Sequence, residues 1–302
     1  MVSTSSPSAA AASFSATALV RALRPRQWLK NVLVFAVPLA AGNVLHRGIL
    51  IPSLLTFVSF CLAASATYLV NDTVDREADR GHPTKRNRPI AAGLVSPAVA
   101  IGTAATLFIL ACAISYAIRP ALFWTVLVYV VSTLAYSLRL KHEPVIELGL
   151  LTAGFLLRAV AGGTATGTPI SKWFLIVAAF GSLFMAAGKR YGELVSLGPD
   201  AEYSRKSLSG YTRSYLRFVW AMAVSVTVTA YCLWAFEVGA RPASLPWAVW
   251  SVAPFVLAML RYAVDVDAGK ADAPEDVVIG DRVLQILGAA WLILFALGAF
   301  GV

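Results

Sequence analysis

Residues 49–79 read ILIPSLLTFVSFCLAASATYLVNDTVDREAD, an apolar run of 22 residues that passes directly into four acidic side chains. About 20 consecutive apolar residues are enough for an α-helix to cross roughly 30 Å of hydrocarbon. Carboxylates stacked at the end of such a helix repel one another unless a cation compensates them. This stretch therefore predicts a transmembrane helix that ends in an oxygen-rich, cation-binding cluster.

The rest of the chain is similarly apolar. Of its 302 residues, 58% are hydrophobic and only 14% are charged, and the mean hydropathy is +0.72. A water-soluble domain could not bury that much apolar surface, so the bilayer must be the solvent. We predict an all-α, polytopic membrane protein with about nine transmembrane helices. They are expected near residues 30–45, 49–70, 96–118, 120–138, 144–164, 172–188, 217–236, 245–262 and 282–301.

The chain is predicted to hold one folded unit. Residues 1–18 are rich in Ser and Ala and carry no charge, which is typical of a disordered tail. Residues 19–302 then form a single intramembrane domain. The three cysteines fall inside apolar runs and the three histidines are scattered, so neither a disulfide framework nor a Cys/His metal cluster is indicated.

The basic residues predict the orientation of the helices. Of the 25 Lys and Arg residues, only Arg47, Arg119, Lys172 and Arg241 fall on one side of the membrane, and Arg158 lies inside a span. The other side is cytoplasmic by the positive-inside rule. The N-terminus is then cytoplasmic and the C-terminus outside, in a plasma or inner membrane. Topology and attraction to anionic lipid account for the net charge of +9, so nucleic acid is not needed as a partner.

The first candidate site is the end of the helix at residues 49–70. Asn71, Asp75 and Asp79 are spaced by four and would share one face of a continuing helix, with Tyr68 and Asp72 beside them. Such a set suits a hard divalent cation such as Mg²⁺, which takes few carboxylates and leaves its other positions to water and phosphate. The alternative is a solvated helix end whose carboxylates pair with nearby arginines.

Basic residues come directly after these carboxylates in the sequence, and further basic residues are predicted at the same face of the membrane. The Lys and Arg side chains of the turn after the carboxylates could neutralise the charge of a polyphosphate bridged by the metal. Arg158 is an isolated cation within a span, which should face the interior and pair with a carboxylate or a substrate anion. The other basic residues could bind phosphate or could simply anchor helices at the interface. The basic candidates and two neighbouring tyrosines are Lys85, Arg86 and Arg88 in the turn, Lys189, Arg190 and Tyr191 after residues 172–188, and Lys30, Tyr136 and Lys141.

The motif Asn71-Asp72 with Asp75 and Asp79, followed by Lys85-Arg86-Asn87-Arg88-Pro89, resembles the first signature of the UbiA family of intramembrane prenyltransferases. The helix layout, the motif after residues 172–188 and the segment from Tyr136 to Lys141 extend the resemblance over nearly the whole chain. It implies a bundle around a central cavity open to the cytoplasm, with lateral access for lipid. It also implies a magnesium-dependent transfer that releases pyrophosphate.

The second motif departs from the usual family pattern. Lys189, Arg190 and Tyr191 stand where paired aspartates are expected. With the segment Arg24-Pro25-Arg26-Gln27-Trp28, this is similar to the phosphoribosyltransferase branch of the family. That resemblance implies phosphoribosyl pyrophosphate as donor and polyprenyl phosphate, such as decaprenyl phosphate, as acceptor, for cell-wall arabinan precursors. Asn71, Asp72, Asp75 and Asp79 would hold magnesium and pyrophosphate, and the second motif would hold the distal phosphate.

Two other functions compete with this one. A prenyltransferase with a prenyl diphosphate donor and an aromatic acceptor would use the same first motif, but it would need a second acidic cluster. A transporter could also have charges within its spans, although here the charges gather at the cytoplasmic mouth. The sequence leaves prenyl chain length, anomeric outcome and oligomeric state open, a homo-oligomer included.

Overall fold

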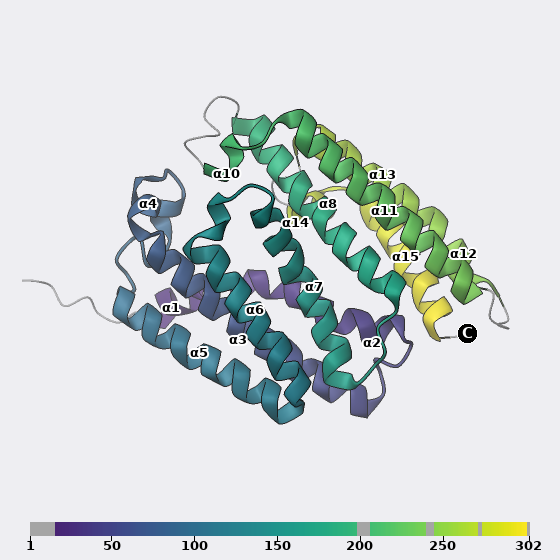
Figure 1. Ribbon diagram of the computed structural model, residues 1–302, viewed down its shortest axis with the longest axis horizontal. Helices are drawn as coiled ribbons and strands as arrows, with labels where there is room; N and C mark the ends of the chain where they lie inside the picture. The colour runs from purple at the N-terminus through teal and green to yellow at the C-terminus, as the bar shows by residue number, and fades with distance from the viewer. Residues whose placement is uncertain (1–15, 198–205, 240–244, 271–273, 301–302) are drawn as a thin grey trace, which may run out of the picture.

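The computed structural model describes residues 16–197, 206–239, 245–270 and 274–300, and these are almost entirely helical (Figure 1). Eight spans in this part are long and apolar enough to cross a membrane, which confirms a polytopic helical protein. They are α3 (Arg47–Val74), α5 (Pro97–Ile118), α6 (Pro120–Leu138), α7 (Ile146–Thr166), α8 (Lys172–Leu197), α11 (Arg213–Gly239), α12 (Trp247–Trp250) continued by α13 (Val252–Asp267), and α15 (Arg282–Phe300).

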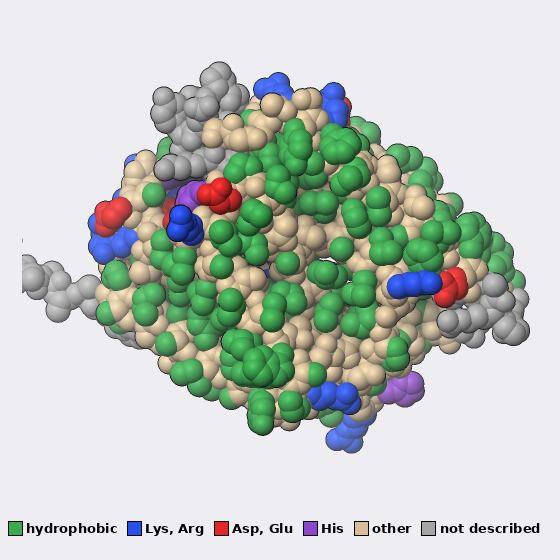
Figure 2. All heavy atoms as spheres, in the orientation of Figure 1, with side chains coloured by type: hydrophobic (Ala, Val, Ile, Leu, Met, Phe, Trp, Pro, Cys, Tyr) green, Lys and Arg blue, Asp and Glu red, His purple; other side chains and the backbone are tan. Residues whose placement is uncertain are grey.

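Short helices connect the long ones. They are α1 (Ala16–Ala22), α2 (Ala36–Ala40), α4 (Arg76–Gly81), α10 (Lys206–Ser209) and α14 (Pro274–Gly280). Residues 1–15 of the predicted tail lie outside the described part, whereas residues 16–18 already belong to α1. Figure 2 shows one face of the bundle, on which apolar side chains predominate and the visible charged ones lie towards the rim. Such a surface suits contact with lipid.

The span predicted at residues 30–45 is not a continuous α-helix. It consists of a 3₁₀ helix, η1 (Pro25–Phe35), followed by the short α2. At a rise of about 2.0 Å per residue in η1 and 1.5 Å in α2, the two still extend about 30 Å. The segment begins beside the end of α3 and reaches the end of α15, where Gly42 lies against the backbone of Ala299. The predicted α-helical form is therefore wrong, and η1 with α2 is not among the eight apolar spans of the described residues.

Close packing explains how a 3₁₀ segment fits inside the bundle. In Figure 1 the chain runs from α1 to α2 behind α6 and α7, and η1 packs on both α3 and α7. A Cβ at Gly162 of α7 would stand only 1.9 Å from the carbonyl oxygen of Val34. The missing side chain lets the two backbones touch near the end of η1. At the start of η1, Arg24 pairs with Asp72 at the acidic end of α3.

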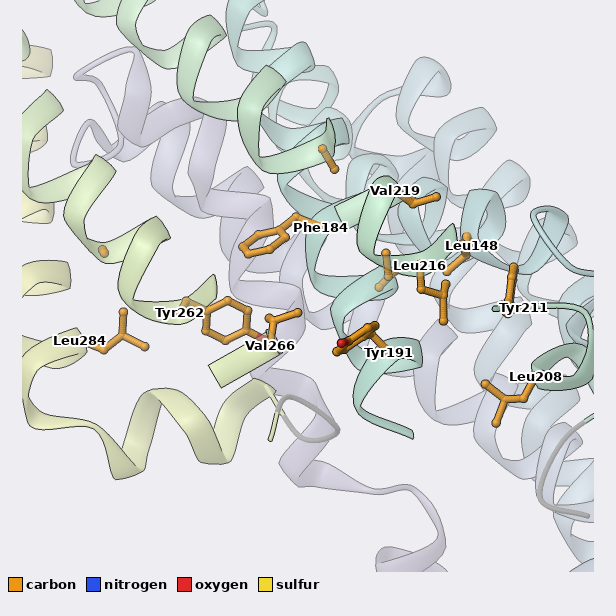
Figure 3. Close-up of a cluster of buried hydrophobic side chains, with 14 residues drawn as sticks. Leu148, Phe184, Tyr191, Leu208, Tyr211, Leu216, Val219, Tyr262, Val266 and Leu284 are labelled. Carbon is orange, nitrogen blue, oxygen red and sulfur yellow. The ribbon is translucent and has the colours of Figure 1, made fainter. Parts of the chain in front are cut away.

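The largest apolar core lies in the C-terminal half, among α8, α11 and α13. Figure 3 shows Phe184, Tyr191, Tyr262 and Val266 among its labelled side chains. The Phe184 and Tyr262 rings meet edge to face with centroids 5.5 Å apart, a favourable arrangement for aromatic pairs. The core fixes the end of α8, which carries the second basic motif.

Candidate active site

Two buried carboxylates share one arginine where α3 gives way to α4. Arg88 Nη1 donates to Asp79 Oδ2 at 2.7 Å and to Asp72 Oδ1 at 3.2 Å. Arg24 Nη2 donates to both oxygens of Asp72 at 2.6 and 2.8 Å, and its guanidinium lies 4.9 Å from the ring centroid of Tyr68. Both aspartates are buried. The structure therefore builds a carboxylate pair held by two cations, which we call the acidic pair.

The grouping of the acidic residues differs from the predicted one. The predicted face was Asn71, Asp75 and Asp79, but Asp79 is grouped with Asp72, because seven residues make nearly two full helical turns. Asp75 lies between α3 and α4 and pairs with Lys141 instead, with its Oδ1 2.5 Å from Nζ. Asn71 is half-buried. The predicted face is therefore wrong, and Asp72 and Asp79 pair with arginines, as in the alternative interpretation. The role of these residues as one metal-binding set stays a prediction.

The acidic pair fits a divalent metal of the hard, oxygen-seeking kind. Arg88 Nη1 already lies between the two buried carboxylates. A positive charge at that position therefore stabilises the two negative charges of the acidic pair. In the described part of the chain no three His, Cys, Asp or Glu side chains converge on one point. Two carboxylates are nevertheless enough for Mg²⁺, which commonly takes one or two and completes its shell with water and phosphate.

A pocket of about 260 Å³ opens beside the acidic pair. Six of its seven lining residues are charged or polar, and three of these are arginines. Arg21 comes from the last turn of α1, and Thr84 and Asn87 from the turn before α5. The complete lining is Arg21, Arg24, Asp72, Thr84, Asn87, Arg88 and Pro89.

The second basic motif forms a closed cluster. Arg190 donates from Nε and Nη2 to the two carboxylate oxygens of Glu147 at 2.7 and 2.8 Å, and from Nη1 to Glu193 at 2.8 Å. Its Nη2 also lies 3.4 Å from the hydroxyl of Tyr136. The Arg190 side chain is only 2% exposed and that of Glu147 is fully buried. This guanidinium is engaged by protein acceptors and screened from solvent.

Tyr191 is likewise an interior residue. Figure 3 shows it within the apolar cluster described above, and its hydroxyl accepts a hydrogen bond from Arg217 Nη2 at 2.9 Å. The geometry therefore corrects the predicted direct contact of Arg190 and Tyr191 with a phosphate. Both residues hold the end of α8, whereas Lys189 is half-buried beside them.

A strained turn positions Glu147. Val145 has φ 66 and ψ −50, and the Ile146 N–H donates to the Pro144 carbonyl at 2.7 Å, which makes a γ-turn that β-branched residues rarely adopt. The Val145 N–H donates to the Tyr211 hydroxyl at 2.7 Å. Burial raises the pKa of Tyr211 to about 12. The Glu147 charge acts in the same direction, whereas the hydrogen bond from Val145 acts against it.

Arg158 is buried within α7, as predicted, but its partners are neutral. Nε donates to the side-chain oxygen of Asn31 at 2.7 Å, Nη1 to the Gly154 carbonyl at 2.7 Å and Nη2 to the Tyr129 hydroxyl at 2.9 Å. Its guanidinium also lies 4.8 Å from the centroid of the Tyr129 ring. Across the described ranges, no carboxylate forms an ion pair with it. This network ties η1 to α6 and α7 and leaves the charge uncompensated.

The structure therefore separates the predicted site residues into groups. Arg88 contacts the acidic pair directly, and Tyr68 contacts it through Arg24. Lys141 pairs with the neighbouring Asp75. Tyr136 belongs to the Arg190 cluster. Of the remaining predicted residues, Lys30 and Lys85 are half-buried and Arg86 is exposed.

Two important residues were missed from the sequence. Arg24 was noted only as part of a basic segment, although it is the bidentate partner of Asp72. Glu147 was overlooked, although a carboxylate inside a predicted span is costly and should have a partner. The co-occurrence of Glu147 and Arg158 within residues 144–164 was a usable signal, although Glu147 in fact pairs with Arg190 from another helix.

Comparisons with known proteins agree with this fold. The model of the UbiA prenyltransferase family matches residues 32–279. The chain is 50% identical to decaprenyl-phosphate phosphoribosyltransferase of Mycobacterium tuberculosis, over 91% of each chain. It is 47% identical to the protein of the same name from Corynebacterium glutamicum, over 94% of this chain and 87% of that protein. A UbiA homologue from Archaeoglobus fulgidus, solved with GPP and Mg²⁺, has the same fold, with a TM-score of 0.71 at 18% identity over 94% of this chain and all of that one.

Proposed function

The chain belongs to the UbiA prenyltransferase family, and on that premise we propose that it transfers the phosphoribosyl group of phosphoribosyl pyrophosphate to polyprenyl phosphate. Pyrophosphate is the leaving group. The names of relatives about half identical over nine-tenths of the chain support decaprenyl phosphate as the acceptor. In this family branch the product would supply cell-wall arabinan synthesis.

The acidic pair is the observation that carries the proposal. Asp72 and Asp79, with Asn71 and Asp75 nearby, would hold magnesium when the pyrophosphate binds. Magnesium bound there would neutralise the charge that develops on the departing pyrophosphate. Arg24 and Arg88 now donate to the carboxylates, and their guanidinium groups would turn to phosphate oxygens as the aspartates take the metal.

The transfer step itself needs few further side chains. The bond from the anomeric carbon to the pyrophosphate oxygen breaks, and a bond from that carbon to an oxygen of the lipid phosphate forms. The intervening centre has oxocarbenium character, which nearby carboxylates stabilise. The acceptor phosphate is already anionic, so it needs positioning and no strong general base. Lys30, Lys141 and Arg158 are our candidates for that role, and Lys85 and Arg86 for help with pyrophosphate.

The protein is an integral, multi-pass membrane protein. We propose in addition that the acidic pair faces the cytoplasm, where phosphoribosyl pyrophosphate is made available. We propose that η1 and α2 together make a ninth passage beside the eight apolar spans of the described part. An odd number of passages would put the termini on opposite sides of the membrane. The central cavity with lateral lipid access remains part of this proposal.

The test is reconstitution of the purified full chain in lipid with Mg²⁺ and phosphoribosyl pyrophosphate labelled in the ribose. We expect label in the organic extract only when decaprenyl phosphate is present, together with release of pyrophosphate. A parallel reaction offers a labelled prenyl diphosphate and 4-hydroxybenzoate. Prenylation of the ring without labelled phosphoribosyl lipid would replace our proposal with aromatic prenyl transfer. Label in neither extract, from a protein that remains folded, would refute both.

A further inference from the structure

The pocket beside the acidic pair has the chemistry of a phosphate-monoester site. Three arginines, a threonine and an asparagine line it: Arg21, Arg24, Arg88, Thr84 and Asn87. Arginine forks match phosphate oxygens in a bidentate manner, and hydroxyl and amide groups supply further donors.

The charges in the pocket are not balanced. Asp72 is its only acidic lining residue, and it faces both Arg24 and Arg88. Arg21 is exposed, and no ion pair of its side chain is found within the described residues. The pocket therefore has a net positive charge that would attract a small anion. This attraction would increase if Arg24 or Arg88 no longer paired with the carboxylates.

The size and the lining indicate which anion fits. About 260 Å³ lies below the roughly 300–1,000 Å³ of pockets that enclose a whole drug-sized ligand, so the pocket suits one end of a larger molecule. Pro89 is the only apolar lining residue, which disfavours the phosphate end of a polyprenyl lipid. The Arg190 cluster, in contrast, is closed by its own carboxylates.

We propose that this pocket binds the 5-phosphate of the phosphoribosyl donor, while the adjoining acidic pair serves the pyrophosphate end. The inference rests on the proposed function and relocates the distal phosphate from the second basic motif to the first. Asp72 belongs to both sites, so a single ribose can connect them. Arg24 is fixed at their boundary by a left-handed backbone, with φ 54, and by its contact with Tyr68.

The test compares Arg21→Gln and Asn87→Ala with Arg26→Gln. All three residues are exposed, so each variant should fold. Arg26 is the matched control, because it belongs to the same basic segment but does not line the pocket. Equilibrium binding to the detergent-purified full chain uses four probes: phosphoribosyl pyrophosphate, ribose 1-pyrophosphate, inorganic pyrophosphate and decaprenyl phosphate.

Wild type and Arg26→Gln should bind phosphoribosyl pyrophosphate at least tenfold more tightly than ribose 1-pyrophosphate. Arg21→Gln and Asn87→Ala should lose most of that preference, with a tenfold or greater loss for the full donor and little change for the other three probes. An equal loss for pyrophosphate would assign the pocket to the leaving group, and a selective loss for decaprenyl phosphate would assign it to the acceptor. Either result, or an unchanged preference, overturns the inference while leaving the proposed transfer intact. Failure of wild type to bind phosphoribosyl pyrophosphate would refute the proposed function itself.

Discussion

Replacing Arg190 by Met tests whether the second basic motif is structural. The guanidinium makes three charge-assisted hydrogen bonds of 2.7 to 2.8 Å to two glutamates, and it is almost fully buried. Removing one partner of a buried ion pair typically costs 3–5 kcal/mol, because the other charge loses its compensation. We therefore expect Arg190→Met to reduce the free energy of unfolding by about 4 kcal/mol, nearly a thousandfold in the folding equilibrium.

The double variant Glu147→Leu with Arg190→Met should recover most of that loss, since well-packed apolar replacements of a buried pair are often neutral or stabilising. Reversible unfolding in mixed micelles measures both variants. Glu77→Gln is the control, because exposed Glu77 pairs with Arg80 at 3.0 Å and such a surface pair contributes only about 0–1 kcal/mol.

Donor binding then separates the two roles of Arg190. If the residue is structural, the stable double variant binds phosphoribosyl pyrophosphate within about threefold of wild type, well below the roughly tenfold or greater loss expected for a missing charged contact. A double variant that regains stability but loses the donor would place Arg190 on the substrate. A single variant that costs less than 1 kcal/mol would contradict the buried pair itself.

Three further outcomes follow from the same contacts. Asp79→Asn should abolish turnover in a folded protein, because the acidic pair loses metal affinity; full activity at saturating Mg²⁺ would remove Asp79 from the site. Arg24→Gly should be about 1 kcal/mol more stable to unfolding than Arg24→Ala, because only the Ala variant keeps a side chain in the left-handed conformation; equal stabilities would contradict that backbone. Tyr211 has a folded pKa of about 12, above its usual 10, so its contribution is full below pH 10 and declines as pH rises to 12. Thermal unfolding of Tyr211→Phe should show a shallower decline over that window, and parallel profiles would refute the assignment.

The fold was largely predictable because length and hydropathy are local properties of the sequence. Residues 97–118, for example, are bounded by a capping Ser96 and by Pro120 at the start of the next helix, and both signals are visible without a structure. The 3₁₀ form of residues 25–35 was not predictable in this way. It depends on contact with α7 at Gly162, and hydropathy does not report the pitch of a helix.

The candidate site was predictable only to the level of its segments. The spacing of Asp72, Asp75 and Asp79 indicated an acidic helix end, and the structure pairs these carboxylates with Arg24, Arg88 and Lys141. The metal site stays a prediction. Helical spacing could not show that Asp75 turns to Lys141, since that partner lies 66 residues away and on another element. The same limit applies to Arg190, whose role is decided by Glu147 on α7.

Exposure distinguishes an ion pair that can accept a ligand from one that only supports the fold. Arg24 and Arg88 are 27% and 26% exposed although Asp72 beneath them is nearly buried, so an incoming phosphate can reach the guanidinium groups without unfolding the site. Arg190 is 2% exposed and Glu147 is not exposed at all. A phosphate would therefore have to break that ion pair and lose its own hydration water to reach Arg190. We therefore propose different roles for the two groups of arginines. Arg24 and Arg88 would exchange protein carboxylates for substrate oxygens, whereas Arg190 joins α8 to α7 through Glu147.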